Sequence, residues 1–256
     1  MTSPTIHSTA VVSSEANLGG GVSLGPFVVI EGNAEIGEGT SIGAHSVVHS
    51  NTKIGKHNRI HSHVILGDDP QHLSFKDETS YLEIGDENTI REMFTAHRSM
   101  YEGGKTVIGS SCYLMSNSHV GHDSIVEDEV IVTSNVALGG HVEVGRKAVI
   151  GGAAGVHQFV RIGSLAMVGA HTYLRQDVLP FSMISGEPAR HYRLNSVGLR
   201  RSGVKGPEYR ALEKAFRLVR EKKGLDEVPI TDQVEHLKEW LSKDSKRGLS
   251  KFVRSG

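Results

Sequence analysis

Four of the chain's fifteen histidines fall close together in one segment: His119, His122, His141 and His157. The imidazole ring titrates near neutral pH, so histidine is the side chain best suited to remove a proton from a substrate. Asp123 follows His122 directly and could orient its ring, although neighbours along a strand usually point to opposite sides. The segment predicts a proton-transfer site. The alternative is a set of structural histidines that bond to backbone carbonyls at corners of the chain.

Every sixth residue is aliphatic over most of the chain, and this period defines the fold that must position the histidines. The series starts at Ile6, passes through Val12 and continues to Leu174. Three positions interrupt it: His72, Glu78 and Glu102. A period of six is typical of a parallel β-helix, in which three short strands and three corners make one coil of about 18 residues. The aliphatic residues then point inward and stack between coils about 4.8 Å apart.

Residues one coil apart lie above one another in such a fold, so the spacing predicts which side chains meet. His122, Gly140 and Gln158 share one column, and His141 and His157 flank it by one residue. A glycine beside a histidine lets a ligand approach and leaves a backbone N–H available to stabilise an oxyanion. This column is the predicted reaction centre.

Two segments, 67–82 and 98–107, interrupt the repeats without changing their phase. Each adds a multiple of six residues, so both are predicted to be loops that leave the coil. Such loops often carry binding residues, although a tolerated insertion is the alternative. The repeats end at Pro180, and helical periodicity begins near Asn195. We predict an all-β solenoid over residues 1–190 and a C-terminal helical cap over 191–256.

The composition narrows the possible partners and the compartment. The chain has 28 basic and 29 acidic residues, and this balance argues against nucleic acid as a partner. Cys112 is the sole cysteine, which excludes an internal disulfide and suits a reducing compartment. The sequence shows no signal peptide and no apolar run long enough to cross a membrane, so we expect a cytoplasmic protein with no transmembrane segment.

Several motifs, in order, resemble the UDP-N-acetylglucosamine acyltransferases that open lipid A synthesis. They are "SHVGHD", "ALGGHV", "GVHQFVRIG" and "NSVGLRRSG", with "PQHLSF", "GEPA" and "SKRGL" extending the likeness over nearly the whole chain. The resemblance implies a left-handed parallel β-helix and a homotrimer with sites in the clefts between subunits. It also implies transfer of an acyl or 3-hydroxyacyl chain from acyl carrier protein to the 3-position of UDP-N-acetylglucosamine or a close analogue.

The same resemblance assigns roles to individual residues. His122 matches the catalytic base and Gly140 the oxyanion donor, in agreement with their shared column, and Asp123 is the group that would orient the base. Residues matching the sugar, acyl and nucleotide parts of the cleft are His97, His119, His141, His157 and Gln158. Asn195 and Arg201 match cap residues that reach the nucleotide, and an arginine suits phosphate because its guanidinium forms paired hydrogen bonds. Ala170, with His171 beside it, falls where the family's acyl-length ruler lies.

The chain departs from the family pattern where the sugar nucleotide is held. The first loop usually reads "QDLKY", so His72 and Ser74 replace a carboxylate and a lysine. Val197 replaces an acidic residue of the cap, Ser202 replaces an arginine, and "HRSM" replaces "HRGT". These changes leave open a related acyltransferase acting on a modified sugar nucleotide, such as one with an amine at the acylated carbon. The sequence itself leaves open the acyl chain length, its 3-hydroxylation and whether the acceptor atom is oxygen or nitrogen.

The expected mechanism needs no metal and no cofactor, because the donor is itself an acyl thioester. A thiolate with a pKa of about 8.5 leaves readily without a dedicated general acid. Acyl carrier proteins are acidic, and five basic residues near the cleft could dock one, unless they are scattered solvated charges: Arg146, Lys147, Arg161, Arg190 and Arg193.

Two other classes of protein share the repeat. A zinc hydratase of the γ-carbonic anhydrase type needs two stacked histidines and a third five residues on. His61 and His97 are 36 residues apart and would stack, but Glu102 occupies the third position and a carboxylate is uncommon there. A non-catalytic scaffold is the other alternative, and the ordered histidine column argues against it.

Overall fold

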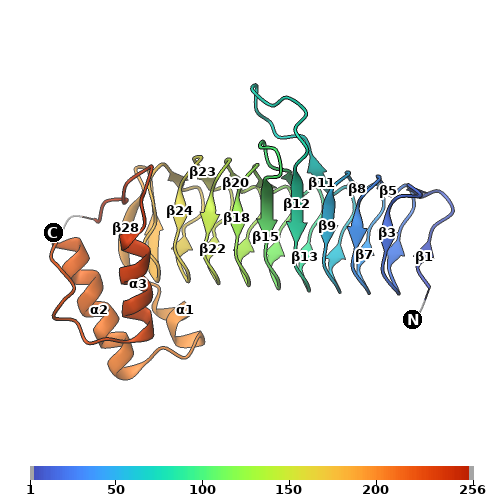
Figure 1. Ribbon diagram of the computed structural model, residues 1–256. Helices are drawn as coiled ribbons and strands as arrows, with labels where there is room; N and C mark the ends of the chain where they lie inside the picture. Colours follow the sequence, from blue (N-terminus) through green and yellow to red (C-terminus); the bar gives the residue numbers. More distant parts are fainter. Residues whose placement is uncertain (1–2, 254–256) are drawn as a thin grey trace.

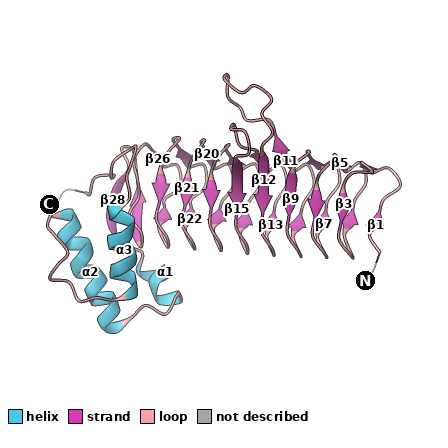
Figure 2. Cartoon of the chain, in the orientation of Figure 1, coloured by secondary structure: helices cyan, strands magenta, loops and turns pink. Residues whose placement is uncertain are grey.

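The computed structural model describes residues 3–253, which form a long solenoid with helices at its C-terminal end (Figures 1 and 2). Three sheets run along the solenoid, and each coil contributes one short strand to each sheet. The architecture is a parallel β-helix, which confirms the fold predicted from the six-residue period, and it is left-handed, as the family resemblance implied. Among the helices described, none is both long and apolar enough to cross a membrane.

The sheets are named A, B and C in the order in which the chain first visits them. Sheet A contains β1 (Thr5–Ile6), β4 (Ser23–Leu24), β7 (Ser41–Ile42), β10 (Arg59–Ile60), β13 (Thr89–Ile90), β16 (Tyr113–Leu114), β19 (Ile131–Val132), β22 (Val149–Ile150), β25 (Met167–Val168), β27 (Ser182–Ser185) and β28 (Arg190–Leu194). Sheet B contains β2 (Val11–Val12), β5 (Val29–Ile30), β8 (Val47–Val48), β11 (Ile65–Asp68), β14 (Thr95–His97), β17 (His119–Val120), β20 (Ala137–Leu138), β23 (Gly155–Val156) and β26 (Tyr173–Leu174). Sheet C contains β3 (Asn17–Leu18), β6 (Glu35–Ile36), β9 (Thr52–Ile54), β12 (Tyr81–Ile84), β15 (Lys105–Ile108), β18 (Ile125–Val126), β21 (Glu143–Val144) and β24 (Arg161–Ile162).

The strand register gives the spacing of the columns. In uninterrupted coils the offset is 18 residues, since His119 pairs with Ala137. The offset is 30 across the first loop, where Arg59 pairs with Thr89, and 24 across the second, where Thr89 pairs with Tyr113. The two loops therefore add twelve and six residues. They lie between β11 and β12 and between β14 and β15, and both project from the same edge of the solenoid (Figure 1).

The aliphatic column forms the core, because the second residue of each two-residue strand points inward. Ile30, Leu114 and Ile150 are typical, with at most 1% of their surface exposed. The corners turn through the left-handed region of φ, which non-glycine residues occupy there, including Asp123 at 60° and His141 at 58°. This conformation changes the direction of the chain within one residue, so neighbours at a corner do not alternate as they do along a strand.

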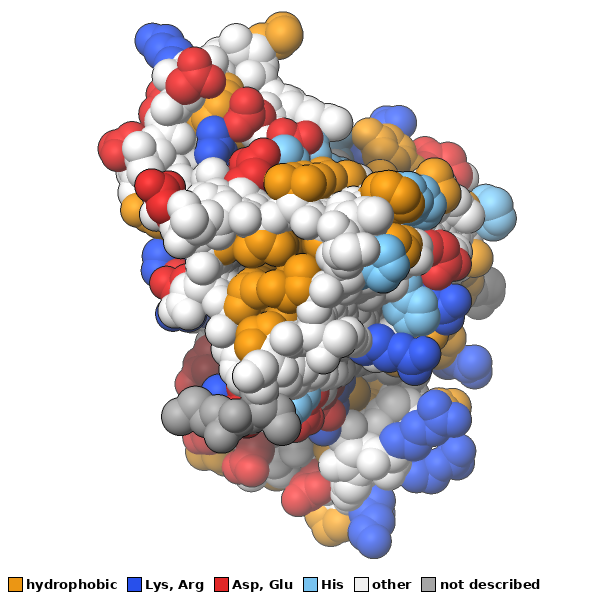
Figure 3. Space-filling model, turned by 90° about the vertical axis from the view of Figure 1, so that its right-hand side faces the viewer, with side chains coloured by type: hydrophobic (Ala, Val, Ile, Leu, Met, Phe, Trp, Pro, Cys, Tyr) orange, Lys and Arg blue, Asp and Glu red, His pale blue; other side chains and the backbone are white. Residues whose placement is uncertain are grey.

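The two ends of the solenoid differ. At the N-terminal end apolar side chains of the first coil are uncovered, and Ile6 is 46% exposed (Figure 3). The C-terminal end is covered by α1 (Ser196–Arg201), α2 (Gly206–Arg220) and α3 (Asp232–Ser242), which enclose a second apolar cluster with Leu179 and Phe181. Strand β28 pairs antiparallel with β27, so sheet A continues four residues past the predicted boundary at 190. The division of the chain into two domains stays a prediction.

Candidate active site

A groove of about 480 Å³ lies over sheet B and the corner that follows it. The outward positions of β20 and β23 are occupied by Ala137 and Gly155, and these small residues leave its floor open. The residues lining the groove are Gln71, His72, His97, His119, Gly121, His122, Ala137, Leu138, Gly139, Gly140, Gly155, Val156, His157, Gln158 and Tyr173. Seven of the predicted site residues therefore meet here.

The predicted column of His122 and Gly140 is present. His122 and Gly140 are one coil apart, and a Cβ added to Gly140 would lie 2.5 Å from Nε2 of His122 and 2.6 Å from its Cε1. Glycine is thus required beside this ring. Within residues 3–253 the Gly140 N–H donates to no other group, so it is available to a ligand in the groove.

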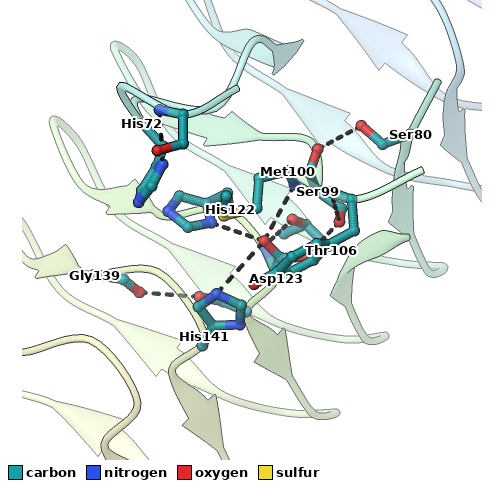
Figure 4. Close-up of polar contacts among 12 residues, drawn as sticks. His72, Ser80, Ser99, Met100, Thr106, His122, Asp123, Gly139 and His141 are labelled. Atoms are coloured by element: carbon teal, nitrogen blue, oxygen red, sulfur yellow. Dashed lines mark hydrogen bonds and ion pairs between the residues drawn. The ribbon is translucent and has the colours of Figure 1, made fainter. Parts of the chain in front are cut away.

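Asp123 holds the ring of His122 from the opposite side, although the two residues are adjacent in sequence. His122 Nδ1 and Asp123 Oδ2 are 2.8 Å apart, because the left-handed turn at Asp123 brings its carboxylate back toward the preceding ring (Figure 4). Burial alone would raise the pKa of Asp123, but hydrogen bonds from His122, Ser99 and Met100 outweigh burial and lower it. An ionised carboxylate only accepts hydrogen bonds, so Nδ1 carries the proton and Nε2 is the free basic nitrogen.

Three further groups fix Asp123. The Ser99 hydroxyl donates to Oδ1, and the Met100 N–H donates to Oδ2 over 3.2 Å. The backbone N–H of Asp123 donates to the Thr106 hydroxyl over 2.7 Å. Figure 4 shows these contacts converging on Asp123 from the second loop and from β15. The carboxylate therefore belongs to a preorganised network rather than to His122 alone.

His141 lies on the far side of Asp123, one coil along the same edge. Its Nε2 is 3.8 Å from Asp123 Oδ2, and its ring lies edge-on to His122 at 5.3 Å. The ring also stacks on Phe159 at 4.4 Å. Burial lowers the pKa of His141, so this residue is neutral at neutral pH.

His97 and His119 form a second imidazole pair in the groove, with ring centroids 4.8 Å apart. Burial lowers the pKa of His119 to about 4, and Thr95 Oγ1 lies 2.8 Å from its Nδ1. Burial also lowers the pKa of His97, which is 5% exposed, and no partner among the described residues bonds its Nδ1. A buried nitrogen without a partner beside an open groove is suited to a substrate hydrogen bond.

The first loop brings His72 to the groove. The His72 and His122 rings are 5.6 Å apart, while Ser74 is exposed and donates its backbone N–H to His72 Nδ1 over 3.2 Å. Arg98 anchors this loop through a 2.6 Å contact with Asp69. Of the two predicted loop residues, the His72 ring therefore faces the groove, whereas Ser74 orients that ring through its backbone N–H.

The C-terminal segment returns to the other end of the groove. The Arg247 guanidinium donates to the carbonyl of Gln158 over 2.7 Å, and the Lys246 ammonium lies 4.1 Å from the centre of the Phe159 ring. His157 lies beside them, with Nδ1 3.3 Å from the same carbonyl. This edge of the groove is positively charged.

Seven predicted site residues do not line the groove of this chain: Asp123, His141 and Ser74, placed above, and four residues that lie away from it. Ala170 and His171 are exposed at the corner between sheets A and B, at the opposite end of the sheet B strands from His122. Asn195 instead caps α1, accepting from the Gly198 N–H at 3.1 Å and donating to the Leu165 carbonyl at 2.9 Å. Arg201 and Ser202 are exposed at the end of α1, and Val197 is exposed in its first turn. Their predicted contacts with acyl chain and nucleotide remain predictions.

The stacked pair expected for a zinc hydratase is absent. His61 follows a sheet A strand and His97 ends a sheet B strand, so they lie at different corners. The first loop shifts the register by twelve residues, and the 36-residue spacing was therefore misleading. A different trio offers one donor atom each within 4.8 Å, namely His122, Asp123 and His141, but the hydrogen bond between the first two already accounts for their approach.

Ser99, Thr106 and Phe159 were not predicted as site residues. Ser99 lies 24 residues before Asp123, which is the offset across the second loop. The 24-residue offset follows from the sequence once the second loop is known to add six residues to the 18-residue coil. This offset is the signal that could have identified Ser99. Phe159 follows His141 by one 18-residue coil, so its stacking was also within reach of the sequence.

Comparisons with known proteins point to one family of acyltransferases. The sequence model described as UDP N-acetylglucosamine O-acyltransferase, domain 2, matches residues 177–256, and that of the bacterial transferase hexapeptide matches 15–50 and 33–68. An acyl-[acyl-carrier-protein]–UDP-N-acetylglucosamine O-acyltransferase of Alkalilimnicola ehrlichii is 51% identical over 84% of this chain and 83% of its own length. The same named enzyme of Thiobacillus denitrificans is 46% identical over 84% of both chains. Among solved structures, a UDP-N-acetylglucosamine acyltransferase from Campylobacter jejuni has 32% identity and a TM-score of 0.90, covering 97% of this chain and all of that one.

Proposed function

The chain belongs to the UDP-N-acetylglucosamine O-acyltransferase family, and from this premise we propose how its groove performs the reaction. The protein transfers an acyl chain from acyl carrier protein to the 3-hydroxyl of UDP-N-acetylglucosamine, forming an ester in the first step of lipid A synthesis. The observation that carries the mechanism is the free Nε2 of His122 close to Gly140 of the next coil, whose N–H has no partner among the described residues. A base and an oxyanion donor so close suit a single acyl-transfer centre.

His122 acts as the general base. Its Nε2 takes the proton of the sugar hydroxyl while that oxygen attacks the thioester carbonyl carbon. Asp123 stabilises the imidazolium that forms, since its carboxylate is ionised and bonded to Nδ1. The tetrahedral oxyanion accepts a hydrogen bond from Gly140 N–H, then collapses to the ester and expels the carrier thiolate. The thiolate takes up the proton, directly or through solvent, and no cofactor enters the sequence of steps.

The neutral histidines suit the recognition of an uncharged sugar. His97 and His119 have lowered pKa values because of burial, so they can each donate or accept a hydrogen bond at neutral pH without repelling His122 when it becomes protonated. His72 faces His122 from the loop. We assign these three residues to the sugar, and His157 and Gln158 to the part of the acceptor nearer the basic C-terminal segment.

A homotrimer accounts for the outer faces of the solenoid. Outward residues of sheet C are mostly charged, as in Glu35, Lys53 and Glu83. The other two sheets carry apolar outward columns over part of their length. On sheet A the column is Tyr113, Ile131, Val149 and Met167, after five polar or charged positions; on sheet B it is Val11, Val29, Val47 and Ile65. Two partly apolar faces and one mostly charged face fit three subunits around an axis, with each groove covered by a neighbour.

The carrier protein is expected to dock on a smaller basic surface than the sequence predicted. Arg161 is 8% exposed, bonds Asp177 at 3.0 Å and lies over the Trp240 ring, so it is structural. Lys147 pairs with Glu129 at 3.4 Å. Arg146 and Arg193 remain exposed and Arg190 half-buried, and these three are the proposed contacts. A cytoplasmic location is also proposed, in keeping with the free thiol of Cys112.

The comparisons favour ester formation over transfer to an amine, because the curated relatives are named O-acyltransferases. The test supplies purified protein with 3-hydroxyacyl and plain acyl carrier protein thioesters, together with UDP-N-acetylglucosamine or its 3-amino analogue. The proposal predicts a product of the ordinary sugar nucleotide that alkaline hydroxylamine cleaves, as it cleaves esters. A product formed only from the amino analogue, and resistant to hydroxylamine, would contradict it.

A further inference from the structure

Asp123 has two carboxylate oxygens with different partners, and only one of them faces His122. Oδ2 accepts from His122 Nδ1 and from the Met100 N–H, at 2.8 Å and 3.2 Å. Oδ1 accepts from the Ser99 hydroxyl. The carboxylate therefore cannot rotate about its Cβ–Cγ bond without breaking the bond to Ser99, and its orientation toward His122 is fixed from behind.

Ser99 is built into this position rather than placed there by chance. Its side chain is fully buried, and its hydroxyl oxygen accepts the Tyr101 N–H over 3.1 Å while it donates to Asp123. Its carbonyl accepts a hydrogen bond from the Ser80 hydroxyl, which joins the second loop to the end of the first (Figure 4). A Cβ added to Gly104 would lie 2.2 Å from Ser99 Oγ, so the glycine leaves the room that this hydroxyl occupies.

We propose that Ser99 is a positioning residue whose hydroxyl holds Asp123 against His122 and limits how strongly Asp123 raises the basicity of that ring. The inference rests on the proposed role of His122 as the base. Ser99 touches neither substrate, since it does not line the groove. It acts through the carboxylate alone.

The direction of its effect follows from the sharing of charge. An ionised carboxylate that accepts a hydrogen bond from Ser99 has less negative charge to offer the His122 N–H, so it stabilises the imidazolium less. Removal of the Ser99 hydroxyl concentrates the charge on the bond to His122 and makes Nε2 easier to protonate. The acid limb of the rate profile should then move to higher pH.

The other groups that face His122 are unchanged by such a substitution. They are His72 from the first loop, His141 from the next coil, and His97 and His119 from sheet B, with Lys246 facing His141. The buried members have lowered pKa values and are neutral near pH 7. Because none of these contacts involves Ser99, a shift of the acid limb reports the link from Ser99 through Asp123.

The experiment compares the pH dependence of kcat/KM for the wild type, Ser99→Ala and Ser99→Gly. Both variants remove the hydroxyl, so one folded variant suffices. The expected result is an acid limb moved up by about half a unit to one unit, a plateau lowered roughly threefold to tenfold, and KM for both substrates within about twofold. Ser46→Ala is the matched control, since Ser46 is equally buried and bonds the His61 carbonyl far from the groove, and its profile should equal the wild type.

A second measurement separates this inference from the proposed function. Diethyl pyrocarbonate modifies neutral imidazole, so its rate of reaction at His122, followed by peptide mass spectrometry across pH, reports the protonation of that ring without any substrate. The midpoint at His122 should rise in Ser99→Ala and stay constant in Ser46→Ala. An unchanged or lower midpoint, together with an unmoved acid limb, would overturn the role of Ser99 even in an active acyltransferase.

Discussion

Replacing Gly140 by alanine should disable the site while leaving the fold intact. The added Cβ would lie 2.5 Å from His122 Nε2 and 2.6 Å from Cε1, whereas carbon atoms in contact are separated by about 3.5 Å. The ring must therefore retreat by about 1 Å. It is held at 2.8 Å by Asp123 on its other side, so the movement breaks or distorts that hydrogen bond. The φ of Gly140 is not in the left-handed region, so alanine itself is tolerated by the backbone.

The expected loss is about 100-fold in kcat, or about 2.7 kcal/mol, since a displacement of about 1 Å in a catalytic group costs about that factor. The assay follows release of carrier thiol at saturating UDP-N-acetylglucosamine, with the melting temperature measured in parallel. Gly152→Ala is the matched control: its added Cβ would meet its nearest neighbours, Ser134 O and Thr133 Oγ1, at 3.5 and 3.7 Å, and its kcat should be unchanged. A Gly140→Ala protein with kcat within about threefold of the wild type would show that His122 does not act from the observed position.

Three further predictions concern stability, assembly and specificity. The free energy of unfolding should be constant above about pH 7 and fall from about pH 6.5 to 4. His119 and His191 have a folded pKa of about 4 against an ordinary value of 6.5, so the unfolded chain binds their protons first, and each residue accounts for roughly 3 kcal/mol. In urea titrations, His191→Gln should make the free energy of unfolding depend less on pH, and an unchanged pH dependence would refute this prediction. Val149→Glu places a charge on the apolar face of sheet A and should give monomers in sedimentation with activity lost; an active trimer would remove this face from the interface. Ala170→Gly should shift the preferred donor from about 10–12 carbons toward longer chains, several-fold per carbon at about 0.8 kcal/mol per methylene, and an unaltered ranking of carrier thioesters would place the ruler elsewhere.

The fold was predictable because a single period determines it. When every sixth residue is aliphatic, all of these residues can face one core if the chain turns after each short strand. Ile30, Leu114 and Ile150 all lie in that core. The corner of His122, Gly140 and Gln158 was predictable for the same reason, since no loop interrupts the coils between residues 108 and 174 and the offset stays at 18.

The predictions were less successful where the register changes or where a polar residue has two possible roles. His61 and His97 seemed stacked because the twelve residues added by the first loop were not subtracted. Ser99 was missed because its partner lies 24 residues on, not 18. Asn195 is an effective helix cap, and an isolated sequence does not distinguish an asparagine that satisfies a helix N–H from one that reaches a ligand.

The assignment of Asp123 shows why corner geometry matters. Alternation along a strand predicts that neighbours point apart, yet the left-handed φ of 60° at Asp123 brings its carboxylate to the His122 ring. Aspartate is among the residues that adopt this conformation most readily. A corner of the solenoid can therefore join a base to its orienting acid within two consecutive residues, which a strand cannot do.

The central claim, that His122 is the base, is tested most directly by His122→Ala in the acyl-transfer assay with the ordinary donor and acceptor. The substitution removes the ring that faces Gly140 and Asp123, so kcat should fall by about two or more orders of magnitude. The oligomeric state and the melting temperature should change little, since His122 lines an open groove. A folded His122→Ala protein that turns over at a rate near the wild type would contradict the account.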